Sequence, residues 1–166
     1  MEYFVGEAYI RKFINANVDW SLLKPLVKDS ALIYLRPLLG FRFFDDLLTK
    51  YNDQTLSPKE EELVEQIKHI QGLRTKYESV LETTYQSSSK GFINQNGDFV
   101  SQLTLDELQE LKGDLNRKIT DVENVMIKWL IFYKDDFPLF EDKINNEIQA
   151  PVNNGRANDG ENFDII

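Results

Sequence analysis

The sequence predicts an all-α protein: a helical bundle with two long helices, a small β-hairpin insertion and an extended C-terminal tail. Three observations predict this class. Apolar residues recur at helical spacing over 58–85 and 105–133. Asn96-Gly97, a dipeptide typical of tight hairpin turns, lies between two short apolar pairs within 91–100. Beyond residue 140 no periodicity is sustained. We therefore predict a helical domain over 1–140 and a flexible tail over 141–166.

The N-terminal third predicts three shorter helices. A first helix is expected over 3–14. The run from Trp20 to Leu39 is so rich in leucine that a helix there should be buried on most sides. Pro25 is suited to starting a helix, and Pro37 should end or kink one. Aromatic and aliphatic residues resume at helical spacing over 41–51, which predicts the third helix.

Each of the two long helices has a marked start. Ser57-Pro58-Lys59-Glu60 and Thr104-Leu-Asp-Glu107 are capping boxes, in which Ser or Thr caps the helix and Glu returns the hydrogen bond. Gly72 is a possible break in the first, so one long helix or two coaxial helices both fit. The second should be about 45 Å long. We expect an antiparallel pair with the 20–48 segment laid across it. The two predicted core stripes are Leu63, Ile67, Ile70, Tyr77, Leu81 and Tyr85, and Leu108, Leu111, Leu115, Ile119, Val122, Met126, Trp129 and Tyr133.

Composition excludes several functional classes. The chain has 166 residues, of which 42% are hydrophobic and 28% charged, as in a single folded domain. It has no cysteine, which excludes disulfides, cysteine-based zinc sites and thiol nucleophiles. The net charge of −9 argues against sequence-independent binding to nucleic acid. Residues 1–13 lack the basic segment, apolar run and small-residue cleavage site typical of a signal peptide, and no stretch approaches 18 uncharged apolar residues, so we expect a soluble protein made in the cytoplasm.

The search for catalytic chemistry predicts no catalytic residues, no metal and no cofactor. His69 is the only histidine, and its place beside the apolar stripe favours a solvated position over a base or a ligand. Neighbouring carboxylates on a helix point about 100° apart, so we expect solvated faces rather than a shared site at Asp45-Asp46, Glu60-Glu61-Glu62, Asp135-Asp136 and Glu141-Asp142. A small helical enzyme whose carboxylates converge on a divalent ion stays open as an alternative.

Four features in order carry a family resemblance. They are Tyr34-Leu-Arg-Pro-Leu-Leu-Gly40, Phe43-Phe44-Asp-Asp-Leu-Leu48, the helix start from Leu56 through Leu63, and Trp129-Leu-Ile-Phe-Tyr133 with Phe137-Pro138. This series resembles the head-to-tail connector (adaptor) proteins of tailed bacteriophages, of the crAss-like phage type. The resemblance covers residues 1 to about 140.

The resemblance implies a structural virion protein at the head-tail junction, made in the host bacterial cytoplasm. Its partners would be the portal protein, the neighbouring tail or ring proteins, and further copies of itself in a homo-oligomeric ring of about twelve. DNA would pass through the ring without specific binding, and no membrane would be involved. An acidic lining, which the charge balance permits, would repel DNA and let it slide.

Two apolar segments are the predicted partner-binding sites. Phe163, Ile165 and Ile166 form an apolar tip on an acidic tail, which is typical of a docking peptide, although a frayed end is the alternative. Phe92 and Phe99 lie on the two sides of the turn within the predicted hairpin, which would project into the bore or toward a neighbour, or is a plain turn. The alternative function is a non-enzymatic helical interaction or scaffold module that binds a protein partner.

Overall fold

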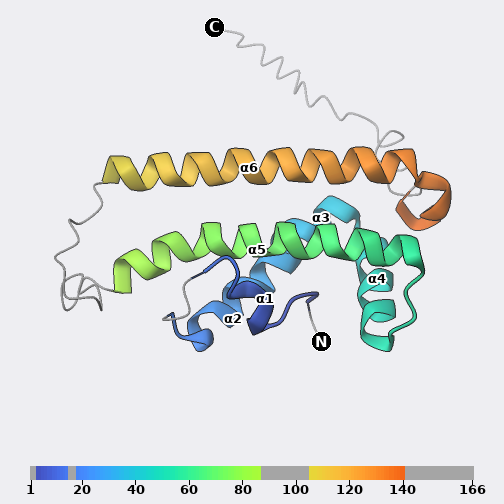
Figure 1. Cartoon of the computed structure of the whole chain (residues 1–166), viewed down its shortest axis with the longest axis horizontal. Coiled ribbons are helices and arrows are strands. Elements are labelled where there is room, and N and C mark those ends of the chain that lie inside the picture. The colour runs from blue at the N-terminus through green and yellow to red at the C-terminus, as the bar shows by residue number, and fades with distance from the viewer. Residues whose placement is uncertain (1–2, 15–17, 87–104, 141–166) are drawn as a thin grey trace, which may run out of the picture.

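A computed structural model describes residues 3–14, 18–86 and 105–140, and all regular structure in these ranges is helical (Figure 1). This confirms the predicted all-α class for the described part of the chain. The predicted hairpin over 91–100 and the predicted tail over 141–166 lie outside it. Within the described ranges, no helix is long and apolar enough to cross a membrane.

The predicted helix over residues 3–14 is wrong in extent, because only Glu7–Ile10 (α1) is α-helical. Gly6 precedes α1 with extended backbone angles. Phe4 and Val5, just before it, are both buried but belong to two different hydrophobic clusters. The chain here therefore joins the two clusters instead of continuing a helix.

The next helical segment runs from Trp20 to Leu39 without a break in its helical path. It comprises α2 (Trp20–Asp29), the π-helical turn η1 (Ser30–Leu35) and α3 (Arg36–Leu39). The Asp19 side chain caps α2 by accepting a hydrogen bond from the Ser21 amide at 2.9 Å. Pro25 therefore lies inside α2 and does not start it. The segment ends at Gly40, whose positive φ of 88° favours glycine.

Pro37 does not end the helical path, so of the two predicted outcomes, an end or a kink, the first is wrong. It lies in the first turn of α3, directly after η1. A proline is tolerated in a first turn because its missing N–H would have no partner within that helix. The π-helical turn before it changes the hydrogen-bonding pattern at this point.

The prediction that this segment is buried on most sides is also wrong. Its buried side chains form one face, whereas Leu22 is 40% exposed and Ile33 is 60% exposed. The segment lies at the outside of the molecule and packs inward on the next long helix. The buried apolar residues of this face are Leu23, Val27, Ala31, Leu35 and Leu39.

Helices α4 (Phe41–Asp53) and α5 (Pro58–Gln86) follow as predicted. The capping box at the start of α5 is confirmed: the Ser57 amide donates to Glu60 Oε2 at 2.8 Å and the Glu60 amide to Ser57 Oγ at 3.3 Å. Helix α5 is continuous through Gly72. That glycine is buried against Phe13, and an added Cβ would lie 2.5 Å from Phe13 Cε2. Gly72 therefore permits a close approach and is not a break.

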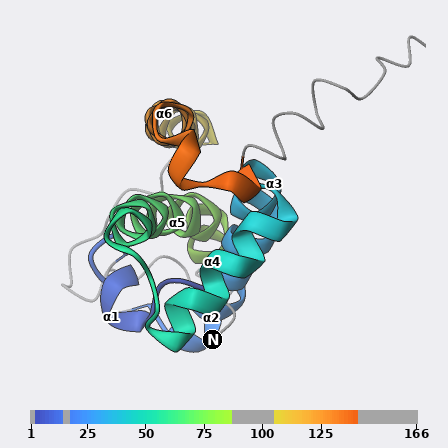
Figure 2. The same cartoon turned by 90° about the vertical axis from the view of Figure 1, so that its right-hand side faces the viewer.

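Helix α6 (Leu105–Phe132) runs antiparallel to α5, as predicted, and a short 3-10 turn, η3 (Lys134–Asp136), follows it. Figures 1 and 2 show α5 between α6 on one side and α1 and α2 on the other. The predicted core stripe of α6 is largely buried, but Leu111 is 40% exposed, so its assignment to the core is wrong. Leu111 lies at the edge of the stripe, on a side of α6 that no described element covers.

Candidate interaction surface

The residues that the sequence predicts as partner-binding sites fall outside the described part of the chain. They are Phe92, Phe99, Phe163, Ile165 and Ile166. Their role stays a prediction.

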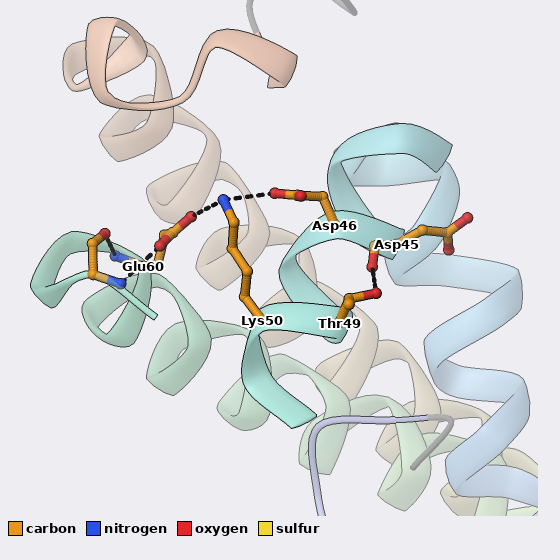
Figure 3. Close-up of polar contacts among 6 residues, drawn as sticks. Asp45, Asp46, Thr49, Lys50 and Glu60 are labelled. Carbon is orange, nitrogen blue, oxygen red and sulfur yellow. Dashed lines mark hydrogen bonds and ion pairs between the residues drawn. The ribbon is translucent and has the colours of Figure 1, made fainter. Parts of the chain in front are cut away.

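A polar network fixes the corner between α4 and α5 (Figure 3). Lys50 Nζ lies 2.8 Å from Asp46 Oδ2 and 2.8 Å from Glu60 Oε1, and so it joins one turn of α4 to the first turn of α5. Glu60 is buried, and its second carboxylate oxygen accepts the Ser57 amide. The predicted solvated position of Glu60 is wrong, because the capping box turns this side chain inward toward Lys50.

Electrostatics keep this network charged. The hydrogen bonds to Asp46 and Glu60 raise the pKa of Lys50. Burial of Glu60 opposes its ionisation, but the hydrogen bonds from Lys50 and Ser57 outweigh this effect and lower its pKa. An ammonium held between two carboxylates is a poor proton donor or acceptor near neutral pH. The network therefore has the properties of a structural clamp.

A second ion pair closes the turn around Gly40. Arg36 Nε and Nη2 donate to the two carboxylate oxygens of Asp45 at 3.0 and 2.6 Å. The Arg36 guanidinium also lies 5.1 Å from the centre of the Phe41 ring. One turn later the Thr49 hydroxyl donates to the Asp45 backbone carbonyl at 2.8 Å (Figure 3). These contacts fix α4 relative to α3.

Two small pockets lie on either side of this corner. One, of about 210 Å³, is lined by Phe43, Asp46, Lys50, Glu60, Asp136, Phe137, Pro138 and Leu139. The other, of about 360 Å³, is lined by Tyr51, Gln54, Leu56, Glu61, Val64, Glu65 and Lys68. In the described residues no group of three or more His, Asp or Glu side chains has an arrangement that could hold a metal ion.

His69 is half-buried, so its predicted solvated position is wrong. Its ring lies 5.5 Å from that of Phe13, centre to centre, because the segment after α1 folds over α5. Burial lowers the pKa of His69, and the nearby Lys118 of α6 lowers it further. An imidazole with this environment is neutral near pH 7 and serves as a packing group.

A buried polar seam joins η1 to α5. The Val27 carbonyl accepts hydrogen bonds from Ser30 Oγ at 2.7 Å and from Gln71 Nε2 at 2.9 Å. Thr75 Oγ1 of α5 lies 3.3 Å from Ser30 Oγ. The Val27 carbonyl, near the end of α2 and just before the π-helical turn, therefore accepts side-chain hydrogen bonds from both η1 and α5. Sequence analysis did not identify this seam, because it depends on contacts between positions more than forty residues apart.

The outer face of α6 carries the largest group of exposed apolar side chains found on one described helix. Val125 is 63% exposed and Phe132 is 78% exposed, and Leu111 is also exposed, whereas the exposed Ile131 points about 100° away from Phe132. Leu111, Lys118, Val125 and Phe132 follow one another at seven-residue steps, so they form one row along the helix. We call this row the α6 outer row. Large apolar side chains grouped on a surface indicate an interaction site.

Sequence analysis missed this row, although its seven-residue spacing is visible in the chain. The apolar residues of α6 fall into a wide stripe, and the part that faces α5 cannot be distinguished from the part that faces away by periodicity alone. Only the packing of α6 on α5 separates the two.

The described residues thus define an all-helical protein whose polar network clamps its corners and whose most exposed apolar side chains lie mainly on one long helix. The model of the Family of unknown function (DUF6712) matches residues 35–150, and the chain belongs to this family. Neither the search of curated proteins nor the search of solved structures gave a match.

Proposed function

We propose that this protein is a head-to-tail connector ring subunit of a tailed bacteriophage. It would join the portal to the tail and leave a central channel for DNA. Its work would be geometric: it would match the surface of one ring to that of the next, without a catalytic residue or a cofactor.

The observation that carries this proposal is that the four sequence features that resemble connector proteins meet in one hydrophobic cluster. Each feature contributes a buried residue to it: Leu39 from α3, Phe44 from α4, Leu63 from α5, and Phe137 from the segment after α6. Phe43 also lies 5.6 Å from Phe137, ring centre to ring centre. The features are therefore parts of one structural unit, and the family match over residues 35–150 spans all of them apart from Tyr34.

The surfaces of the protein suit a ring. Subunits in a ring meet through two different surfaces, one on each side. Exposed apolar side chains occur on two separate parts of the described chain: Ile33 and Phe41 on η1 and α4, and Val125 and Phe132 on α6. The net charge of −9 would weaken contact with passing DNA.

The test is assembly with a portal protein encoded in the same genome. The two proteins would be co-expressed, purified as one particle and imaged by electron cryomicroscopy. We expect a ring of about twelve copies on the portal, with an open bore. Absence of any complex with the portal would contradict the proposal.

The alternative function is a helical scaffold module, which the exposed α6 outer row favours because it could seat a helix of a partner. The same preparation distinguishes the two functions. A module of this kind gives a complex of small, fixed stoichiometry with a cellular protein and forms no ring with the portal.

A further inference from the structure

The α6 outer row has a defined pattern of charge. From Leu111 to Phe132 it spans about 31 Å of helix. Its apolar members alternate with a second row at the same seven-residue steps, Asp114, Asp121 and Lys128. The Asp114 carboxylate forms an ion pair with Arg117 of the next turn, and both side chains are exposed. The two rows have the spacing of a and d positions; the first is apolar except for Lys118, and the second is charged throughout.

The charges select among the possible partners of this face. If a second copy of α6 packed in parallel, each residue would meet its own equivalent. Asp114 would then face Asp114, Lys118 would face Lys118 and Lys128 would face Lys128, and like charges directly opposite each other destabilise a contact. A parallel pair is therefore disfavoured.

An antiparallel pair gives the opposite result. With the two helices crossing near Asp121, Leu111 of one copy lies opposite Phe132 of the other, and Asp114 lies opposite Lys128. Symmetry repeats both contacts at the other end of the pair. Val125 lies opposite Lys118, whose aliphatic stem can cover an apolar neighbour while its ammonium reaches solvent. The two Asp121 side chains come close at the centre, each with Lys118 three residues away on its own helix.

We propose that, in the free protein, the α6 outer row is covered by the same row of a second copy in an antiparallel pair. The pair is isologous and closes at two copies. It would have to separate before α6 could contact a different surface in a ring. The proposal concerns the free subunit and does not rest on the proposed connector function.

Charge reversal tests the pairing directly. The dimer dissociation constant of the full chain would be measured by analytical ultracentrifugation, without portal protein. Asp114→Lys and Lys128→Asp should each raise it by about tenfold, because both symmetric contacts then oppose like charges. The double variant Asp114→Lys/Lys128→Asp should return it to near the original value. In a parallel pair neither single change alters the like-charge contacts, so neither would weaken association.

Two further variants test the apolar part. Phe132→Ser should weaken the dimer, whereas Ile33→Ser, which removes an exposed apolar side chain far along the chain from α6, should not. Asn116→Lys adds a charge to an exposed position of α6 outside the two rows and serves as the matched control. Circular dichroism would verify that each variant is folded.

Three results would overturn the proposal. They are a monomer at every accessible concentration, a dimer that the double charge reversal fails to restore, and a dimer that Ile33→Ser weakens as much as Phe132→Ser does. None of these results bears on ring formation with the portal, so this proposal and the connector function can fail separately.

Discussion

Arg74 of α5 and Glu123 of α6 form a two-pronged ion pair between the two long helices. Arg74 Nε donates to Glu123 Oε1 at 3.0 Å, and Nη2 donates to Oε1 and Oε2 at 2.9 Å each. Both side chains are largely buried, at 13% and 14% exposure. The guanidinium also lies 4.5 Å from the centre of the Tyr34 ring, and the Tyr34 hydroxyl donates to Glu78. One arginine therefore connects α5, α6 and η1.

We predict that Arg74→Ala lowers the free energy of unfolding by about 3 kcal/mol, because it leaves the Glu123 carboxylate poorly solvated and unpaired. The measurement is urea denaturation followed by circular dichroism. The double variant Arg74→Met/Glu123→Leu should lose clearly less free energy of unfolding than the summed losses of the single variants Arg74→Met and Glu123→Leu. The reason is that no charge is left buried without a partner in the double variant. Simple additivity of the two losses would show that the residues do not act as a pair.

The hydrophobic contact between α5 and α6 gives a second prediction. Ile119 is fully buried, so Ile119→Ala should lower the free energy of unfolding by about 2 to 5 kcal/mol through lost burial and a cavity; Leu115→Ala should fall in the same range. Val125→Ala is the control on the same helix. Because Val125 is mostly exposed, its change should stay within about 0.5 kcal/mol. A neutral Ile119→Ala would mean that α6 is not central to the core.

Two glycines inside long helices should respond oppositely to alanine. Gly72→Ala should lower the free energy of unfolding by about 1 to 3 kcal/mol, because the new methyl group meets the Phe13 ring. Gly113 of α6 has no neighbouring atom within 4 Å of an added Cβ, so Gly113→Ala should stabilise the protein by about 0.5 to 1 kcal/mol. Thermal unfolding of the two variants beside the original chain measures both signs.

Phe13 provides the internal check on this pair. In a Phe13→Ala background the Gly72→Ala change should lose most of its cost, because the ring that it collides with is gone. If Gly72→Ala remained equally destabilising there, the contact with Phe13 would not be the cause.

The long helices were predictable from the sequence because their signals are local. The capping box at Ser57 and the spacing of apolar residues along 105–133 determine where α5 and α6 lie, and the structure has both close to the predicted bounds. Core membership was less predictable. Leu22, Ile33 and Leu111 are as apolar as their buried neighbours, and only the direction from which α5 packs leaves them exposed.

Contacts between distant positions account for the remaining errors. Nothing near Pro37 in the sequence indicates the π-helical turn before it. The hydrogen bond from Gln71 to the Val27 carbonyl, next to that turn, joins positions 44 residues apart. Likewise the place of His69 beside the apolar stripe predicts a solvated position, whereas in the structure the Phe13 ring, from the segment after α1, lies 5.5 Å from the His69 ring, centre to centre. The α6 outer row could have been found by its spacing, but its exposure could not.

The lowered pKa of His69 predicts how the stability of the protein depends on pH. Its folded pKa lies below the ordinary 6.5 because burial and Lys118 disfavour the imidazolium. The unfolded chain therefore binds a proton at His69 more readily than the folded chain does. The contribution of neutral His69 to the free energy of unfolding is fully present above about pH 6.5 and is lost as the pH falls below this value. His69→Gln should remove this part of the loss between about pH 7 and pH 5.5, where few carboxylates titrate. Urea midpoints at several pH values measure it, and identical pH profiles for the two proteins would contradict it.

The last prediction concerns the C-terminal segment, which the sequence predicts to be a docking tail. Residues 141–166 contain six acidic and two basic residues, a net charge of −4, and end in Phe163-Asp-Ile-Ile166. If this tip binds the portal or a neighbouring subunit, burying three apolar side chains should supply several kcal/mol per copy, about 1.5 to 3 for each side chain before the cost of ordering the tail. A ring of many copies would multiply the effect through avidity.

Deleting residues 155–166 should therefore leave the helix content and the melting temperature of the free protein unchanged and weaken its binding to the portal. Substituting Phe163, Ile165 and Ile166 by serine should reproduce the loss with the chain length intact. Binding at full strength by either variant would show that the tip is not a docking site, and a lowered melting temperature would show that the segment packs on its own helices.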